Sequence, residues 1–315
     1  MSVRGAETLP RERVRTRMRE RVRAAVRVEA LRAAPGEVET LVAALRERYG
    51  ERFSGALYYG SCRHRSDPEG IYDLHVLVSE LRGALAPLPA ALCRWLPPNV
   101  YYLEAAHEGR TVRCKYAVLS VEQFERGCSR RAFHSYFWGR YAQPVTLVGF
   151  EASESIIESL TSAVETLAWR ALPRLGEVTE ARAYWLGALR LSYAAELRPE
   201  GDERAATLVD AYPEYYRATG AAILEARAEV PGGTPGSHAL RARIDWAARS
   251  ASGKLLTVAR LLKGLVTFEG GIDYLAYKLE RHTGVPVVIT EAARRRPLLY
   301  VWPIVWRLWR QGAFR

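Results

Sequence analysis

The chain has 315 residues and a formal net charge of +11, with an isoelectric point near 9.7. This length is sufficient for a full hydrophobic core and predicts two domains, or one domain with a large helical addition. The apolar and charged fractions argue against a disordered chain. The positive charge favours anionic partners: a nucleotide, a nucleic acid or an acidic membrane surface.

The cysteines and lysines are few and widely spaced. The four cysteines form no Cys-x-x-Cys pair, which argues against a zinc site and predicts the reduced thiols of a cytoplasmic protein. Arginine supplies almost all of the positive charge. A lysine retained in such a chain could therefore have a role that a guanidinium group cannot fill. The lysines are Lys115, Lys254, Lys263 and Lys278.

The first part of the chain predicts a basic arm followed by an amphipathic helix. Residues 1–35 are rich in arginine but also contain acidic residues, which argues against an organelle transit peptide and favours a solvated helical arm. After Pro35-Gly36, apolar residues recur at helical spacing as far as Gly50. A strand is expected at Ala56 to Tyr59.

The most informative motif follows this strand. Tyr59-Gly60-Ser61 ends it, and about a dozen residues later a second strand carries Asp73. A glycine lets the backbone approach a triphosphate, and a serine hydroxyl can donate to a phosphate oxygen. A carboxylate on the next strand can hold a divalent ion. This layout is typical of nucleotidyltransferase active sites.

The alternation of side chains along the strands places polar groups on one face. Asp73 and His75 share a face of their strand, and Arg113 and Lys115 share a face of a later one. We expect that later strand, Thr111 to Leu119, to form a hairpin with the strand from Asn99 to Ala105, after a stretch broken by prolines. The expected sheet is mixed and mainly antiparallel. Its two polar faces could look into one cleft.

From residue 151 the pattern becomes helical. Ser155 with Glu158 resembles a capping box, and the helix that follows should stop at Pro173. Further helices are expected at 184–197, 205–228, 238–268 and 272–281, with a joint rich in glycine and proline at 231–236. The predicted fold class is α+β. Its expected divisions are a basic arm at 1–35, a nucleotidyltransferase domain at 36–150, a mainly helical domain at 151–290 and a tail at 291–315.

The tail combines tryptophans with arginines. Its apolar run is shorter than the roughly 20 residues needed to cross a bilayer. Placed as an amphipathic helix in the headgroup layer of an anionic membrane, it would bury its indoles and pair its arginines with phosphates. The alternative is a helix docked on its own domain. The proposed membrane residues are Trp302, Trp306, Trp309, Arg307 and Arg310.

Several segments, in order, resemble one family. They are Tyr59-Gly60-Ser61, Tyr72-Asp73-Leu74, Val100-Tyr101-Tyr102, Gly109-Arg110, Lys115-Tyr116-Ala117-Val118, Gly139-Arg140-Tyr141-Ala142-Gln143-Pro144-Val145, Leu191-Ser192-Tyr193-Ala194-Ala195-Glu196-Leu197-Arg198, Arg249-Ser250 and Lys263-Gly264-Leu265-Val266. Together they look like the mitochondrial translocator assembly and maintenance family of phosphatidate cytidylyltransferases. The resemblance spans roughly residues 45 to 280, and the missing transit peptide suggests a bacterial member. Gln143, Glu196 and His75 depart from the family pattern.

The resemblance implies a peripheral enzyme on the cytoplasmic face of the membrane, with a nucleotidyltransferase domain followed by a winged-helix-like domain. It would make CDP-diacylglycerol from CTP and phosphatidic acid, or a related lipid phosphate, with Mg²⁺. Asp73 and Lys115 would be catalytic, and Tyr59, Gly60, Ser61 and Lys115 would bind the nucleotide. Asp73 and Glu196 would hold the metal. The second domain offers Ser192, Tyr193, Glu196, Arg198 and Lys263 as further candidates.

Other interpretations stay open at this point. Asp73 could be a surface residue, Lys115 could lie on a solvated strand face, and Glu196 with Arg198 could be a salt bridge at a helix end. His75 could bind metal or be satisfied by a neighbour. The protein could instead transfer nucleotides to RNA or a small molecule, although no RNA-binding motif accompanies the charge. It could also bind nucleotide or membrane without catalysis.

Overall fold

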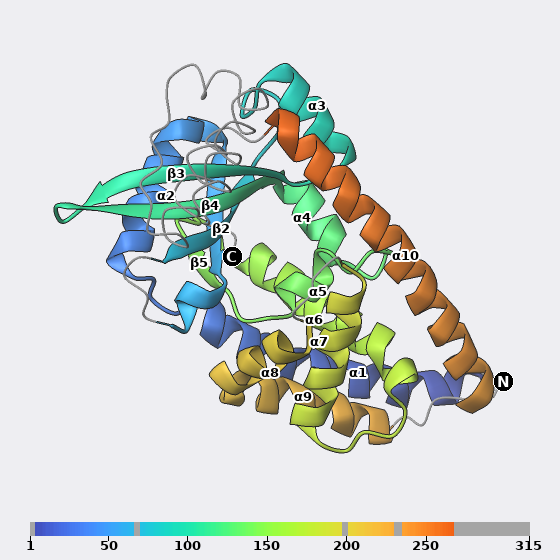
Figure 1. Cartoon of the computed structure of the whole chain (residues 1–315). Helices are drawn as coiled ribbons and strands as arrows, with labels where there is room; N and C mark the ends of the chain where they lie inside the picture. Colours follow the sequence, from blue (N-terminus) through green and yellow to red (C-terminus); the bar gives the residue numbers. More distant parts are fainter. Residues whose placement is uncertain (1–3, 66–69, 197–200, 230–234, 268–315) are drawn as a thin grey trace, which may run out of the picture.

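The computed structural model describes residues 4–65, 70–196, 201–229 and 235–267. The part described contains one β-sheet surrounded by helices, so the predicted α+β class with a mixed sheet is confirmed (Figure 1). Within the described residues, no helix combines the length and hydropathy needed to cross a bilayer. Arg198, the predicted helix at 272–281 and the tail at 291–315 lie outside these residues.

Five strands form the sheet in the order β3-β4-β2-β1-β5. Strands β2 and β4 run parallel, and the other neighbours are antiparallel. The predicted hairpin is present: β3 and β4 are joined at Glu108-Gly109, both with positive φ, as a tight hairpin turn requires. The strands are β1 (Phe53–Tyr59), β2 (Ile71–Val78), β3 (Asn99–His107), β4 (Arg110–Ser120) and β5 (Thr146–Val148).

One face of the sheet is covered by α2 (Gly36–Tyr49), as its apolar spacing predicts. All five positions of the predicted stripe are buried in one cluster with side chains of β1, β2 and β4. The cluster contains even-numbered residues of β2 and β4. Because successive side chains of a strand point to opposite faces, the odd-numbered residues point to the other face of the sheet. The stripe of α2 consists of Val38, Leu41, Val42, Leu45 and Tyr49.

The opposite face is covered by the second group of helices. Leu57, Leu77 and Leu119 of the sheet belong to the same apolar cluster as the helices that follow residue 151. The core is therefore continuous across the expected boundary at residue 150. The helices are α4 (Val121–Cys128), α5 (Trp138–Tyr141), α6 (Glu154–Leu175), α7 (Ala181–Ala194), α8 (Gly201–Ala211), α9 (Pro213–Glu229) and α10 (Pro235–Thr267). In the described part of 151–267 these are the only regular elements.

The basic N-terminal segment forms α1 (Arg4–Ala30), which is helical as expected but is packed on the protein. Its residues Val22, Val26 and Ala30 are buried against α6 and α9. Its arginines pair with glutamates of those two helices, including Arg17 with Glu229 at 2.7 Å. The expectation of a solvated arm was wrong, because these glutamates lie 127 to 212 residues away in the sequence. The other pairs are Arg19–Glu158, Arg19–Glu165, Arg21–Glu225, Arg23–Glu154 and Arg27–Glu154.

Four local predictions need correction. The proline-rich stretch contains a helix, α3 (Pro87–Trp95), since prolines are tolerated in the first turn. No side chain caps α6, and Ser155 lies inside it. Pro173 also lies inside that helix, in its final turn. The single helix expected at 205–228 is divided into α8 and α9 before Pro213.

Candidate functional site

A row of four polar side chains crosses the sheet. Tyr59 of β1 pairs with Asp73 of β2, Asp73 pairs with Lys115 of β4, and Lys115 pairs with Tyr102 of β3. Cross-strand partners point to the same face of a sheet. Three of the residues predicted from sequence are thus brought together on the face opposite α2.

Asp73 and Lys115 form the centre of the row. The Lys115 ammonium lies 3.1 Å from Asp73 Oδ1, and the side chains are 39% and 21% exposed for lysine and aspartate respectively. An ion pair with this much solvent contact contributes little to stability. Its geometry instead places one cation and one carboxylate side by side where a ligand can reach both.

Gly60 brings the backbone directly against this carboxylate. Its φ is 90°, a conformation that side chains strongly disfavour, and a Cβ built there would lie 2.6 Å from Asp73 Oδ2. Ser61 then begins a short 3₁₀ turn (Ser61–Arg63) and is exposed. Glycine is therefore required at position 60 both by the backbone conformation and by the space available.

A cavity of about 410 Å³ opens beside this turn. It lies between the turn after β1 and helix α8, and its lining is rich in donors. Two guanidinium groups, a hydroxyl from each side and an amide make it suited to an anion. The lining residues are Gly60, Ser61, His64, Arg65, Gln143, Glu203, Arg204, Thr207 and Leu208.

Arg140 approaches the row from α5. It lies 3.3 Å from Glu196, which follows α7, and its guanidinium stacks 4.6 Å from the ring centre of Tyr136. Burial opposes the charge of Arg140, but Tyr136, Glu196 and a hydrogen bond with Tyr59 outweigh it and raise its pKa above the ordinary value. Arg140 is thus a cation held against Tyr59, the first member of the row.

Three of the second-domain candidates belong to α7 or directly follow it, and two of them contact α5. Glu196 pairs with this arginine, 3.3 Å from its guanidinium. Ser192 is buried against Gly139, where an added Cβ would lie 1.9 Å from the serine Oγ. Tyr193 is also buried in the apolar core. These contacts bring α7 to the site as structural support for α5.

Lys263 lies at a different contact. Its ammonium donates to the carbonyls of Leu96 and Pro98, the latter at 2.6 Å, which fixes α10 to the loop between α3 and β3. Burial lowers the pKa of Lys263 to about 8. Its neighbour Arg260 donates to Pro97 and lies 4.0 Å from the ring centre of Tyr136, so α10 reaches the surroundings of Arg140 through Arg260.

His75 lies two residues after Asp73 on β2, on the same face of the sheet, and is fully buried. Its ring stacks on Tyr59 with centroids 4.6 Å apart and meets Tyr141 edge-on at 5.3 Å. Burial, with Arg140 and Lys115 nearby, holds the pKa of His75 well below its ordinary value. His75 is therefore a neutral imidazole whose ring packs against Tyr59 and supports it.

Within the described ranges, no group of three or more His, Cys, Asp or Glu side chains could hold a metal ion. Magnesium in nucleotide sites usually takes one or two carboxylates and completes its shell with phosphates and water. Asp73 has one carboxylate oxygen towards Gly60 and the other at Lys115. It could therefore serve as the carboxylate ligand of such a magnesium ion. Glu196 is held by Arg140 instead.

Sequence reasoning did not propose Arg140 or Arg260 as site residues. Arg140 belongs to the Gly139-Arg140 segment of the resemblance, so that segment was the available signal. Nothing local distinguishes Arg260 from the other arginines of the chain. Its position depends on the packing of α10 across α3 and the segment before α5.

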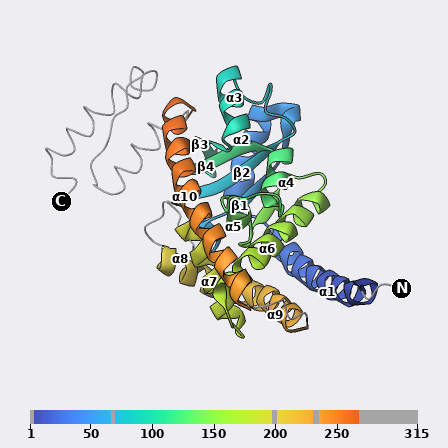
Figure 2. The ribbon, with the colours of Figure 1, turned by 90° about the vertical axis from the view of Figure 1, so that its right-hand side faces the viewer.

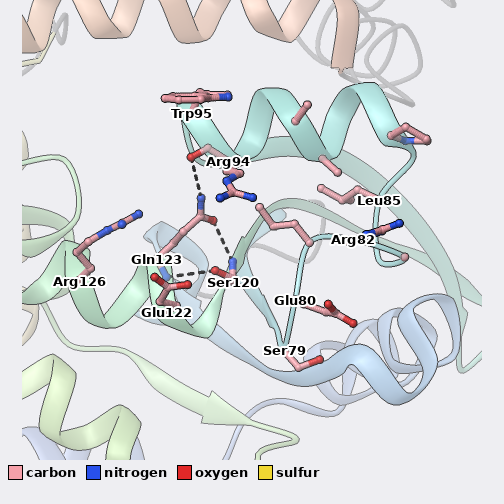
Figure 3. A pocket seen from close by; sticks show the side chains of 15 residues that line it. Ser79, Glu80, Arg82, Leu85, Arg94, Trp95, Ser120, Glu122, Gln123 and Arg126 are labelled. Atoms are coloured by element: carbon pink, nitrogen blue, oxygen red, sulfur yellow. Dashed lines mark hydrogen bonds between the residues drawn. The ribbon is translucent and has the colours of Figure 1, made fainter.

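A larger open cavity, of about 780 Å³, lies between α3, α4 and the loop after β2. Figure 3 shows Arg94 and Arg126 on either side of Gln123, which ties α4 to α3 by donating to the carbonyl of Cys93 at 2.9 Å. Ser120 and Gln123 form a capping box that begins α4. This cavity lies at the ends of β2 and β4 remote from Asp73, where Val78 pairs with Ser120.

No protein-family model matches this chain, and no curated protein matches it either.

Proposed function

We propose that this protein is a nucleotidyltransferase that transfers CMP from CTP to phosphatidic acid, or to a related lipid phosphate, and releases pyrophosphate. The observation that carries the proposal is the contact of Gly60 with Asp73, with Lys115 3.1 Å from the same carboxylate. A close backbone beside a partly exposed carboxylate and cation provides the groups that a nucleoside triphosphate requires. The sequence resemblance supports cytidylyl transfer to a lipid phosphate.

In the proposed reaction, an oxygen of the lipid phosphate attacks the α-phosphorus of CTP. A new P–O bond forms, the bond from the α-phosphorus to the bridging oxygen breaks, and pyrophosphate takes the electron pair. The attacking phosphate is already an anion, so the protein's task is to position two polyanions and offset their repulsion. Lys115 would donate to a reacting phosphate, and Ser61 and the Gly60 backbone would hold the triphosphate.

The metal site implied by this chemistry would use Asp73. A bound Mg²⁺ would neutralise charge on the reacting phosphates. With Asp73 as a ligand of that ion, Lys115 would donate to a phosphate oxygen beside it. Arg140 provides a second, buried cation against Tyr59.

The test is an assay of purified protein with CTP, Mg²⁺ and vesicles containing phosphatidic acid, measuring CDP-lipid and pyrophosphate. Asp73→Asn and Lys115→Met should each lower the rate by about 100-fold or more. Arg113→Met is the matched control, because Arg113 lies on the same face of β4 and pairs with Glu104 at 3.0 Å. Wild-type rates in Asp73→Asn would remove this residue from the mechanism.

Two further arms separate the other functions. An RNA or small-molecule acceptor would give CMP transfer without phosphatidic acid, at the same Asp73 and Lys115. A non-catalytic protein would bind CTP in a magnesium-dependent way and release no pyrophosphate with any acceptor. Preference for CTP over ATP in the binding arm would support the cytidylyl assignment.

A further inference from the structure

Helix α10 reverses the usual distribution of side chains on a surface helix, which normally buries an apolar stripe and exposes polar residues. Apart from Trp246, the face that packs on the protein contains small, polar and charged side chains. Arg249 is 1% exposed and donates to the carbonyl of Phe133 at 2.6 Å, and Lys263 donates to Leu96 and Pro98. The buried positions are Ala242, Trp246, Arg249, Lys263 and Thr267.

The outer face of the same helix is apolar. At 100° per residue, its large exposed side chains fall within an arc of about 140° that runs along the helix. Four of them are more than 60% exposed, with Leu255 at 70%. Exposed alanines at 247, 248 and 251 continue the arc between its two halves. The outer face consists of Leu240, Ile244, Leu255, Val258, Leu261, Leu262 and Val266.

The charges beside this outer face are all positive. Arg241, Arg243 and Lys254 are exposed at its edges. The sequence of α10 contains a single acidic residue, Asp245, which lies near the buried side and is partly covered. An apolar ridge bordered by cations is the pattern of a surface that binds anionic lipid.

The end of α3 lies beside α10. Trp95, the last residue of α3, is 86% exposed. The hydrogen bond from Lys263 to Leu96 places the last turns of α10 beside this end of α3 (Figure 2). Figure 3 shows Trp95 next to α10 with Arg94 below it. An exposed indole beside a guanidinium group is suited to the headgroup layer of a bilayer.

We propose that the outer face of α10, with Trp95 of α3, is the surface by which the protein docks on an anionic lipid bilayer. The nature of the lipid rests on the proposed function, since an enzyme acting on a lipid phosphate must reach the membrane surface. The apolar residues enter the bilayer to the level of the upper acyl chains, and the cations contact lipid phosphates. The buried side of α10 contributes Arg260 to the surroundings of Arg140, so the same helix connects the membrane to the candidate site.

The experiment attaches an environment-sensitive fluorophore to a cysteine at position 262, on the outer face of α10, which we call the ridge. The full-length protein carries Leu262→Cys with Cys62→Ser, because the other three native thiols are buried. Phosphatidylcholine vesicles containing phosphatidic acid should shift the emission to the blue and raise it several-fold, and pure phosphatidylcholine vesicles should do so weakly. The matched control is Val28→Cys on α1, which is also exposed and should show no shift.

A second measurement uses vesicle sedimentation without any label. The triple variant Leu255→Ser, Val258→Ser and Leu262→Ser should weaken binding to phosphatidic acid vesicles by about tenfold or more. The double variant Val28→Ser and Leu31→Ser removes exposed apolar side chains from α1 and should bind as the wild type does. Equal binding by the triple variant and the wild type would overturn the proposal.

The fluorophore also reports other occupants of the ridge. Blue emission at position 262 before vesicles are added would overturn the proposal. In that case a doubled mass in light scattering would identify a second copy, and a monomer mass would identify residues 268–315 as the cover. Emission unchanged by anionic vesicles but altered by RNA would overturn it as well.

Docking and catalysis can fail separately. Asp73→Asn should dock as the wild type does, because Asp73 is not part of the ridge. Short-chain, water-soluble phosphatidic acid tests transfer without a membrane, and the triple variant should use it normally. Docking without any CDP-lipid would reject the proposed function alone, whereas transfer to the soluble lipid without a vesicle-induced shift would reject the docking surface alone.

Discussion

Gly60 lies against the carboxylate of Asp73 so closely that a methyl group on its Cα would stand 2.6 Å from Oδ2. Its φ of 90° is also unfavourable for any side chain. Gly60→Ala should therefore lower the free energy of unfolding by about 3 kcal/mol, with conformational strain and displacement of Asp73 both contributing. We expect nucleotidyl transfer to fall by about 100-fold, as measured by urea unfolding and by the CTP assay.

Gly109→Ala is the control for the strain alone. Gly109 has φ 78°, in the turn between β3 and β4, and nothing lies within 4 Å of an added Cβ. This variant should lose about 1 kcal/mol and retain its activity. Equal losses of activity in the two variants would show that contact with Asp73 is not the reason for glycine at position 60.

The Arg140–Glu196 pair should be worth far more than a surface pair. Both side chains are largely buried, so Glu196→Gln leaves the guanidinium without its carboxylate in a desolvated place. We expect a loss of about 3 kcal/mol in urea unfolding. Glu214→Gln breaks the exposed pair with Arg217 and should cost less than about 0.5 kcal/mol. Similar losses in the two variants would contradict this account.

His75 should make the protein sensitive to acid. The folded chain keeps this imidazole neutral, because burial lowers its pKa well below 6.5, while the unfolded chain takes up a proton near that pH. Acid therefore favours the unfolded state, and stability from His75 is lost as the pH falls below about 6.5. Relative to His75→Leu, the wild type should lose about 1.5 kcal/mol between pH 6.5 and about pH 5. A constant difference between the two proteins across this range would contradict the prediction.

Gly139 and Ser192 should behave as a coupled pair. An alanine at 139 would put its Cβ 1.9 Å from Ser192 Oγ and 3.0 Å from the serine Cβ. Gly139→Ala alone should cost about 3 kcal/mol, and Gly139→Ala with Ser192→Ala should recover about 1 kcal/mol or more of that loss. Additive effects in a double-mutant cycle, measured by thermal unfolding, would show that the two elements can separate without cost.

For the row Tyr59–Asp73–Lys115–Tyr102, the sequence predicts the strand face of a side chain but not the order of the strands. Alternation along each strand is enough to place Asp73 on one face of β2 and Lys115 on one face of β4. It does not indicate that β2 and β4 are neighbours, because a parallel pairing between them depends on the whole sheet order. The register that sets Asp73 opposite Lys115 is a tertiary property.

The parts missed by sequence share one physical cause. Helical periodicity shows where α10 is apolar, but it does not show which face meets the protein. In this helix Arg249 and Lys263 are inward because backbone carbonyls of Phe133, Leu96 and Pro98 accept their hydrogen bonds. The apolar face of α1 was not assigned to the core for the same reason, since its partners come from other helices.

The pairing of α1 with α6 and α9 also sets an order for folding during synthesis. Helix α1 is synthesised before α6 and α9, yet the glutamate that meets Arg17 is Glu229. More than 200 residues must be made before this contact can close, whereas the glutamates of α6 that pair with Arg19, Arg23 and Arg27 are made earlier. Docking of α1 is therefore complete only after α9 has been synthesised.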